Sequence, residues 1–301
     1  MSKNKHATNL PPLFENVPKK IMQGEVFASF PVNTFLENIA INEDGDLFVT
    51  SLDEGAVYKI NSKGEKEVYS KTKGKLAGII YISAQTFLLN GWNEEGIPTV
   101  YFLKKDKEII PLIHPADALF LNGIASLTNN IFLICDAYKG CIWKYNSDAN
   151  RAEIWLQHPL LSRIDDTNPM PAANGIKIFK GTVFVSNTAK QLLIKISLND
   201  TDAGIPELFM EKVNLDDFAI DNNGDIYAAT HIYNSAVKIT QQKQMVIIGE
   251  AEQGLAGSTA VAFGKREDDK NCIYVTTNGG MSLPLPKGVQ EGRIIKIKIT
   301  S

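Results

Sequence analysis

The chain has 301 residues, of which 44% are hydrophobic and 22% charged, and its net charge at pH 7 is −3. This balance is ordinary for a globular protein and lacks the basic surface that nucleic acid requires, so we expect no nucleic acid partner. No apolar run approaches the roughly 18 residues that cross a bilayer, and the basic residues 1–6 have no apolar stretch behind them, so we expect neither a membrane partner nor a secretory signal.

The three cysteines Cys135, Cys141 and Cys272 form an odd set without the spacing of a metal site. Cys135 and Cys141 flank a short loop and could approach each other. We expect reduced, partly buried thiols, which is typical of a cytoplasmic protein.

Along the chain, a predicted strand over residues 25–30 is followed by six copies of one sequence motif. Each copy opens with a polar or small residue and an alternating apolar strand. After a turn, each continues with a second strand of the type Phe/Tyr-Val-x-Ser/Thr/Asn. The openings lie about 40 to 50 residues apart, a period typical of arrays of β units. They begin at Glu37, Ala77, Asn122, Asn174, Asp216 and Ser258.

The first copy shows four strand-like runs, over residues 38–41, 47–50, 56–60 and 66–69. Asp44-Gly45 and Lys63-Gly64 separate two pairs of these runs. Glycine adopts the positive φ of a tight turn at little cost, so these pairs indicate hairpins. Each copy is therefore predicted to form a four-stranded antiparallel sheet.

The sixth copy ends at its third strand, over residues 293–299, and the run over residues 25–30 supplies the missing fourth. A terminal strand that completes the last sheet closes a propeller ring. The sequence thus predicts an all-β, six-bladed β-propeller. It forms a single domain over residues 1–301, with residues 1–23 as a flexible or loosely docked lead-in.

In such a ring the openings of the copies meet at the axis. Glu37, Asn122, Asn174 and Asp216 would place two carboxylates and two amides there, while Ala77 and Ser258 leave room. This all-oxygen set suits Ca²⁺ or another divalent cation, whereas zinc or copper would require imidazole or thiolate. The alternative is that these residues only close Asx-type turns before their strands.

Glu37, Asn174-Gly175 and Asp216, on six such repeats over about residues 24–300, resemble the senescence-marker-protein (regucalcin) and gluconolactonase family. The resemblance implies a divalent metal, often calcium, held by Glu37, Asn174 and Asp216. Asp216 would also be the general base or would orient the attacking water in lactone hydrolysis.

Two departures from the family pattern concern the substrate. Leu215-Asp216-Asp217 stands where the family usually has Pro-Asp-Gly, so a second carboxylate follows the expected ligand. Leu121-Asn122-Gly123 lacks the polar neighbours that grip a sugar lactone. We therefore expect a less sugar-like substrate.

Loops at the same mouth are predicted to carry the substrate-binding residues, together with Asn122. His231 is placed for acid–base work, and its alternative role is that of a hydrogen-bonded rim histidine. The long loops over residues 161–173 and 277–292 are candidate lids or walls. The predicted substrate-binding residues of these loops are Trp92, Tyr138, Asn187, Tyr233 and Met281.

The leading functional hypothesis is a metal-dependent hydrolase of a small cyclic ester, with a small-molecule substrate and an open oligomeric state. One alternative is a non-hydrolytic binding or interaction protein on the same scaffold. Another is a propeller enzyme of small-molecule biosynthesis, such as a cyclase, condensing enzyme or isomerase.

Overall fold

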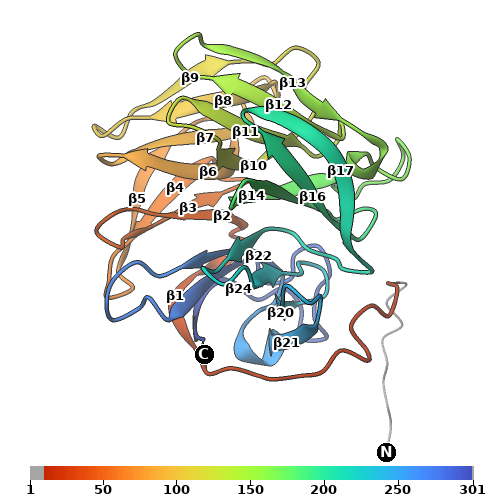
Figure 1. Cartoon of the computed structure of the whole chain (residues 1–301). Coiled ribbons are helices and arrows are strands. Elements are labelled where there is room, and N and C mark those ends of the chain that lie inside the picture. Colours follow the sequence, from red (N-terminus) through yellow and green to blue (C-terminus); the bar gives the residue numbers. More distant parts are fainter. Residues whose placement is uncertain (1–9, 300–301) are drawn as a thin grey trace, which may run out of the picture.

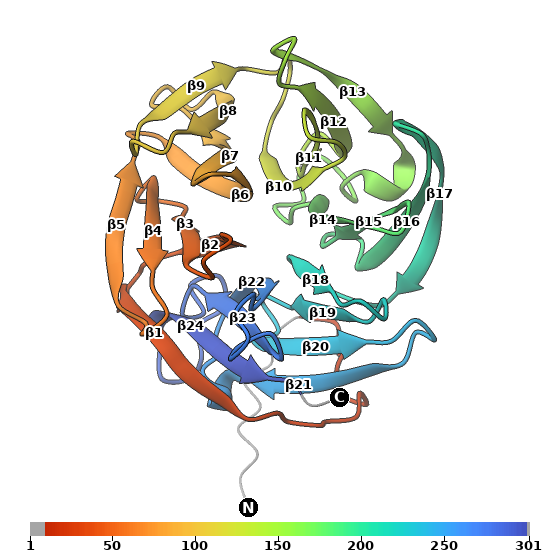
Figure 2. The ribbon, with the colours of Figure 1, turned by 60° about the vertical axis from the view of Figure 1, so that its left-hand side comes forward.

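The computed structural model describes residues 10–299, and these form six four-stranded antiparallel sheets arranged as a ring (Figure 1). In the view of Figure 2 the sheets radiate from a central axis as the blades of a propeller. The innermost strands around that axis are β2 (Leu36–Ile41), β6 (Lys75–Ser83), β10 (Leu121–Ser126), β14 (Ala173–Phe179), β18 (Phe218–Ile220) and β22 (Ser258–Phe263).

The remaining strands of each blade follow outward in chain order. Blade one adds β3 (Leu47–Ser51), β4 (Ala56–Ile60) and β5 (Lys66–Lys71), and blade two adds β7 (Thr86–Trp92), β8 (Pro98–Leu103) and β9 (Ile109–Ile113). Blade three adds β11 (Ile131–Asp136), β12 (Cys141–Asn146) and β13 (Arg151–Gln157), and blade four adds β15 (Thr182–Asn187), β16 (Leu192–Asn199) and β17 (Asp202–Glu211). Blade five adds β19 (Ile226–Ala229), β20 (Ser235–Ile239) and β21 (Met245–Glu250).

Blade six is assembled from both ends of the described chain, as the sequence predicted. Its strand order is β22, β23 (Cys272–Thr277), β24 (Glu291–Lys298) and then β1 (Gly24–Val32). The antiparallel register pairs Gly24 with Ile297 and Val32 with Glu291. The predicted six-bladed propeller with an N-terminal closing strand is therefore confirmed.

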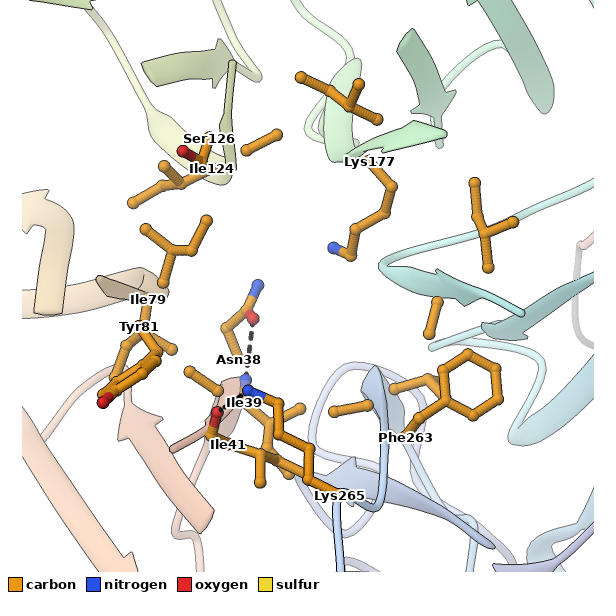
Figure 3. A pocket seen from close by; sticks show the side chains of 18 of the residues that line it. Asn38, Ile39, Ile41, Ile79, Tyr81, Ile124, Ser126, Lys177, Phe263 and Lys265 are labelled. Carbon is orange, nitrogen blue, oxygen red and sulfur yellow. Dashed lines mark hydrogen bonds between the residues drawn. The ribbon is translucent and has the colours of Figure 1, made fainter. Parts of the chain in front are cut away.

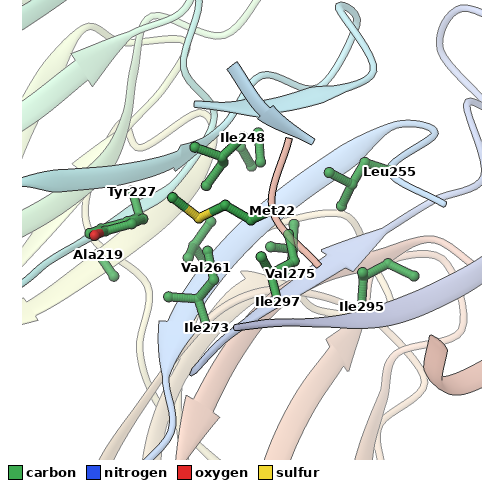
Figure 4. Close-up of a cluster of buried hydrophobic side chains, with 12 residues drawn as sticks. Met22, Ala219, Tyr227, Ile248, Leu255, Val261, Ile273, Val275, Ile295 and Ile297 are labelled. Atoms are coloured by element: carbon green, nitrogen blue, oxygen red, sulfur yellow. The ribbon is translucent and has the colours of Figure 1, made fainter. Parts of the chain in front are cut away.

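The apolar core lies between neighbouring blades, because each sheet has two faces to cover. The cluster in Figure 4 joins Tyr227 of blade five to Val261, Ile273 and Ile295 of blade six. Met22, which precedes β1, inserts into this cluster and is 8% exposed.

The described part of the lead-in, residues 10–23, runs along blade five. The backbone N–H of Met22 donates to the Ile248 carbonyl at 2.8 Å, and Phe14 packs edge-on against Tyr233 with ring centroids 4.8 Å apart. The rest of the predicted lead-in, residues 1–9, lies outside the described residues.

Secondary structure other than strand is sparse within residues 10–299. Two short 3₁₀ helices occur, Pro159–Leu161 and Ala251–Gln253. None of the helices in this part of the chain is long and apolar enough to cross a membrane.

Candidate functional site

The four predicted axial residues gather at one mouth of the channel, where the innermost strands begin. All four side chains are nearly inaccessible to solvent, with exposed fractions of 7% for Glu37, 3% for Asn122, 2% for Asn174 and 4% for Asp216. In β2 the ladder to β3 shifts register between Leu36 and Ile39, and the innermost strands of blades two, three, four and six shift at the same place. Such a bulge re-aims the side chains within it, and here it contains the axial residue.

In blades two to four, the glycine after the axial residue is required by close packing between neighbouring inner strands. A Cβ on Gly78 would lie 2.2 Å from the Asn122 carbonyl oxygen, and one on Gly123 would lie 2.3 Å from that of Asn174. Only glycine allows each inner strand to approach the next so closely. The repeated Ala-Gly and Asn-Gly openings of blades two to four thus place consecutive axial residues side by side.

Polar side chains from the second strands hold the axial backbone. Thr50 Oγ1 donates to the Ala77 carbonyl at 2.6 Å, Asn90 Nδ2 donates to that of Asn122 at 2.6 Å, and Ser186 Oγ donates to that of Asp216 at 2.7 Å. These three residues were not among the predicted site residues. Their signal was the polar position that recurs near the end of each second strand.

The sixth axial position is Thr259, not Ser258, so the sequence alignment of blade six was wrong by one residue. Ser258 pairs with Thr277 and the ladder resumes at Val261, just as Leu36 pairs with Ser51 before the shift. Ser258 therefore corresponds to Leu36. Blade six lacks the glycine that follows the axial residue in blades two to four, and Thr259 Oγ1 donates to the Leu36 carbonyl at 2.8 Å.

Each axial carboxylate accepts a hydrogen bond from an axial amide. Asn122 Nδ2 donates to Glu37 Oε1 at 3.2 Å, and Asn174 Nδ2 donates to Asp216 Oδ1 at 2.5 Å. Burial, reinforced by the negative charge of Asp216, raises the pKa of Glu37 to about 8. The two buried carboxylates are thus each bound to an axial amide and are close enough for their charges to interact.

His231 holds the other oxygen of Asp216. Its Nδ1 lies 3.0 Å from Asp216 Oδ2, and its side chain is 14% exposed. Burial lowers the pKa of His231, but the charge of Asp216 and the hydrogen bond to it outweigh burial, so that the pKa is raised overall. The residue has a φ of 42°, in the left-handed region, which marks a constrained backbone.

The tautomer of neutral His231 follows from Asn278. Asn278 Oδ1 accepts from the backbone N–H groups of Gly280 and Met281, at 2.9 and 3.1 Å, which turns its Nδ2 toward His231 Nε2 at 2.9 Å. Since an amide Nδ2 can only donate, Nε2 accepts and Nδ1 carries the proton that faces Asp216. Ser282 Oγ lies 3.1 Å from the same Nε2. Asn278 lies in the long loop over residues 277–292 that was predicted to be a lid or wall.

Asp217, the second carboxylate after Leu215, is paired separately. Lys177 Nζ lies 2.5 Å from Asp217 Oδ1, whose side chain is 6% exposed. Burial raises the pKa of Asp217, and Lys177 opposes that shift. This ion pair neutralises Asp217, so Glu37 and Asp216 carry the negative charge of the axial group.

Within residues 10–299, no three His, Cys, Asp or Glu side chains come together as a metal site. The axial group nevertheless fits a hard divalent cation, because it combines two buried, mutually repelling carboxylates with two amides that can present their oxygens. Burial is the main cause of the raised pKa of Glu37, and an ion between the carboxylates would remove the repulsion by Asp216 that adds to it. The residues that could hold it are Glu37, Asn122, Asn174 and Asp216.

Two of the predicted substrate-binding residues belong to an aromatic cluster. Trp92 lies against Phe120 with ring centroids 4.5 Å apart, and Phe120 packs edge-on against Tyr138 at 5.1 Å. Arg163 from the long loop before β14 lies over the Tyr138 ring at 5.0 Å. Phe120 was not predicted as a member, although it directly precedes β10.

The other predicted residues make local contacts. Asn187 is fully buried, and its Nδ2 donates to the carbonyls of Leu160 and Ser162 at 2.8 and 3.0 Å, so it fixes the long loop. Tyr233 donates its hydroxyl to the Pro11 carbonyl at 2.8 Å in the lead-in. Met281 is partly exposed, and its backbone N–H donates to Asn278 Oδ1 at 3.1 Å.

No protein-family model matches the chain, and a search of the curated proteins finds no match. Solved structures do match. The calcium-binding protein regucalcin from Agrobacterium tumefaciens aligns over 94% of this chain and 96% of its own, with a TM-score of 0.74 and 13% identity. The chain therefore shares its fold with regucalcin.

A gluconolactonase from Xanthomonas campestris matches with a TM-score of 0.71 and 11% identity, over 93% of this chain and 90% of its own. A luciferin-regenerating enzyme matches with a TM-score of 0.70 and 14% identity, over 93% of this chain and 98% of its own. The likeness to regucalcin and gluconolactonase that the sequence indicated is thus present in three dimensions. At these identities it establishes the fold, and the chemistry rests on the residues of the site.

Proposed function

We propose that this protein is a metal-dependent hydrolase that opens a small cyclic ester, with Ca²⁺ or another divalent cation as its cofactor. The observation that carries the proposal is the buried pair of carboxylates, Glu37 and Asp216, each bound to an axial amide. A solved neighbour of the same fold is a gluconolactonase, and another is a calcium-binding protein, which supports both halves of the proposal.

Glu37 and Asp216 would hold the cation through their carboxylates, with Asn174 and Asn122 contributing amide oxygens. When bound, such an ion polarises the ester carbonyl and stabilises the negative charge that develops on it. Lys177 neutralises Asp217, so the axial group would carry a charge of about −2 once Glu37 and Asp216 are both ionised, and a divalent ion would balance that charge.

Asp216 is the proposed general base. Its Oδ2 faces His231 Nδ1, and this hydrogen bond fixes the carboxylate while Asn278 fixes the imidazole. Asp216 would remove a proton from water as the water attacks the ester carbonyl. The same proton would then pass to the alkoxide that leaves when the ring opens, so His231 positions the base without itself changing charge.

The mouth favours a substrate with an apolar substituent. Trp92, Phe120 and Tyr138 offer aromatic surface beside the opening of blade three. Binding sites for small molecules combine such surfaces with a few fixed polar groups, here the axial amides and carboxylates. A lactone with an alkyl or aryl group fits this wall better than a sugar lactone.

The test begins with metal analysis of the purified protein and a panel of alkyl, aryl and sugar lactones, each assayed with and without a chelator. We expect ring opening that the chelator abolishes and Ca²⁺ restores. A saturating ion at a hundredfold excess over its Kd should stabilise the native state by about 2.7 kcal/mol. Glu37→Gln should remove this stabilisation. Asp53→Asn, at an exposed carboxylate of the same mouth, is the matched control and should keep it.

The proposed base is tested separately. Asp216→Asn keeps the side-chain volume and a carbonyl ligand but removes the base, so turnover should fall by roughly 10²–10⁴-fold while metal binding falls less. Wild-type protein that binds no divalent ion would refute the metal site. Wild-type protein that binds Ca²⁺ yet opens no lactone at any pH would refute the hydrolase.

A further inference from the structure

The far half of the channel is a cavity. It has a volume of about 520 Å³ and is lined by the later residues of all six innermost strands, whereas the axial carboxylates lie where those strands begin. Figure 3 shows these side chains pointing from the surrounding blades into one space, with Ile39, Ile79 and Ile124 on adjacent blades. The cavity therefore opens at the mouth opposite the candidate active site.

The wall of this cavity is apolar and carries no carboxylate. Aliphatic residues line its middle, and Tyr81, Phe179 and Phe263 add aromatic surface. None of its described lining residues is Asp or Glu. The charged groups on the wall are two lysines, Lys177 and Lys265.

The two lysines differ in their partners. Lys177 is neutralised by Asp217 at the inner end. Lys265 belongs to no ion pair within residues 10–299. Its Nζ donates to the Ile41 carbonyl at 2.6 Å and lies 5.4 Å from the centre of the Tyr81 ring (Figure 3). Much of the Lys265 side chain is exposed at the rim, but its ammonium group lies against the wall of the cavity. The partial burial of this group disfavours its charged form and lowers the pKa of Lys265.

We propose that this cavity binds a small carboxylate with an apolar body, such as a medium-chain fatty acid, with the carboxylate at Lys265 and the hydrocarbon in the channel. The volume falls within the roughly 300–1,000 Å³ of small-molecule sites. The apolar wall accepts the body, and a carboxylate supplies the counter-ion that Lys265 lacks. The residues proposed to bind this ligand are not those proposed for metal binding and hydrolysis, so the cavity could bind a carboxylate even if the protein is not a hydrolase.

The probe is octanoate, titrated calorimetrically into the full-length protein, with 1-octanol as the neutral analogue. We expect saturable binding of one octanoate. Lys265→Met keeps the apolar stem but removes the charge, and it should weaken octanoate binding by about 10- to 100-fold, the range for a charged hydrogen bond. It should leave octanol binding unchanged. Lys265→Arg should retain octanoate binding.

Two further variants locate the ligand. Lys270→Met removes a nearby exposed lysine that is already paired with Glu267, and it should bind octanoate as the wild type does. Ala262→Phe places a ring in the cavity and should abolish binding of octanoate and octanol alike, with thermal denaturation confirming that the variant is folded. No saturable octanoate binding below about 10 mM, or equal affinities in wild type and Lys265→Met, would overturn the proposal.

Discussion

Closing of the ring by β1 can be tested at a single side chain, Phe30. Phe30 is 2% exposed and packs between Ile294 of blade six and Tyr58 of blade one, with its ring centroid 5.0 Å from that of Tyr58. It therefore joins the first blade to the last. Phe30→Ala should remove this contact and leave a cavity across the closure.

The expected loss is about 3–5 kcal/mol of unfolding free energy, the usual cost of truncating a buried phenylalanine. An unfolding entropy of about 2.1 cal/mol/K per residue gives about 0.6 kcal/mol/K for 301 residues. The Tm should therefore fall by about 5–8 °C, measured by circular dichroism or calorimetry with the variant in chelator and in Ca²⁺.

Val26→Ala is the matched control, since Val26 lies on the same strand and is 51% exposed. It should change Tm by no more than about 1 °C, as surface substitutions usually stay within about 0.5 kcal/mol. Deletion of residues 1–31 removes all of β1 except Val32 and should lower the free energy of unfolding by more than Phe30→Ala does. If Phe30→Ala lowers Tm no further than the control does, β1 contributes no closure energy and our reasoning fails.

Three further outcomes follow from the site. In chelator, the native state should lose stability as pH rises from about 5 to 8. The raised pKa values of Glu37 and His231 mean that the folded protein binds more protons than the unfolded chain there. Urea unfolding midpoints across this pH range would measure the loss of stability. Added Ca²⁺ or Glu37→Gln should reduce this pH dependence. Wild-type stability that does not change with pH in chelator would count against the buried pair of Glu37 and Asp216. Gly123→Ala should lower Tm and weaken metal binding because its Cβ meets the Asn174 carbonyl, and an unchanged variant would show that the inner strands need no such approach. Thr50→Val should lower the free energy of unfolding by about 1–3 kcal/mol, because it leaves the buried Ala77 carbonyl without its donor. Thr86→Val is the control and should cause no measurable loss, because Thr86 bonds the Ser83 carbonyl in a solvated hairpin.

The sequence was sufficient to predict the ring, because each blade repeats its own turn and strand pattern and the missing strand is visible by count. The closing strand was predicted over residues 25–30 and observed as Gly24–Val32. Its ends are set by pairing with β24, which local propensity does not report. Five of the six axial positions were predicted for the same reason, since one repeat position means one place in space.

What the sequence did not reveal depends on partners from different blades. Lys177 and Asp217 are 40 residues apart, and His231 and Asn278 are 47 apart. Nothing local relates such pairs, so neither the neutralised carboxylate nor the tautomer could be anticipated. The one-residue error at Ser258 has a different origin, because a register shift inside a strand has no marker when glycine is absent.

The closing of blade six also sets an order of events during synthesis. Strand β1 is made before the rest of the propeller, yet its partner β24 is made only after the five other blades. At about 5–20 residues per second, β1 waits unpaired for roughly tens of seconds while those blades fold. Throughout that interval its backbone groups and Phe30 are open to other chains, as is the bare edge of β24 once it emerges. The newborn protein thus passes through an open arc that is prone to misassembly, and its yield in a cell should depend on how quickly the two ends meet.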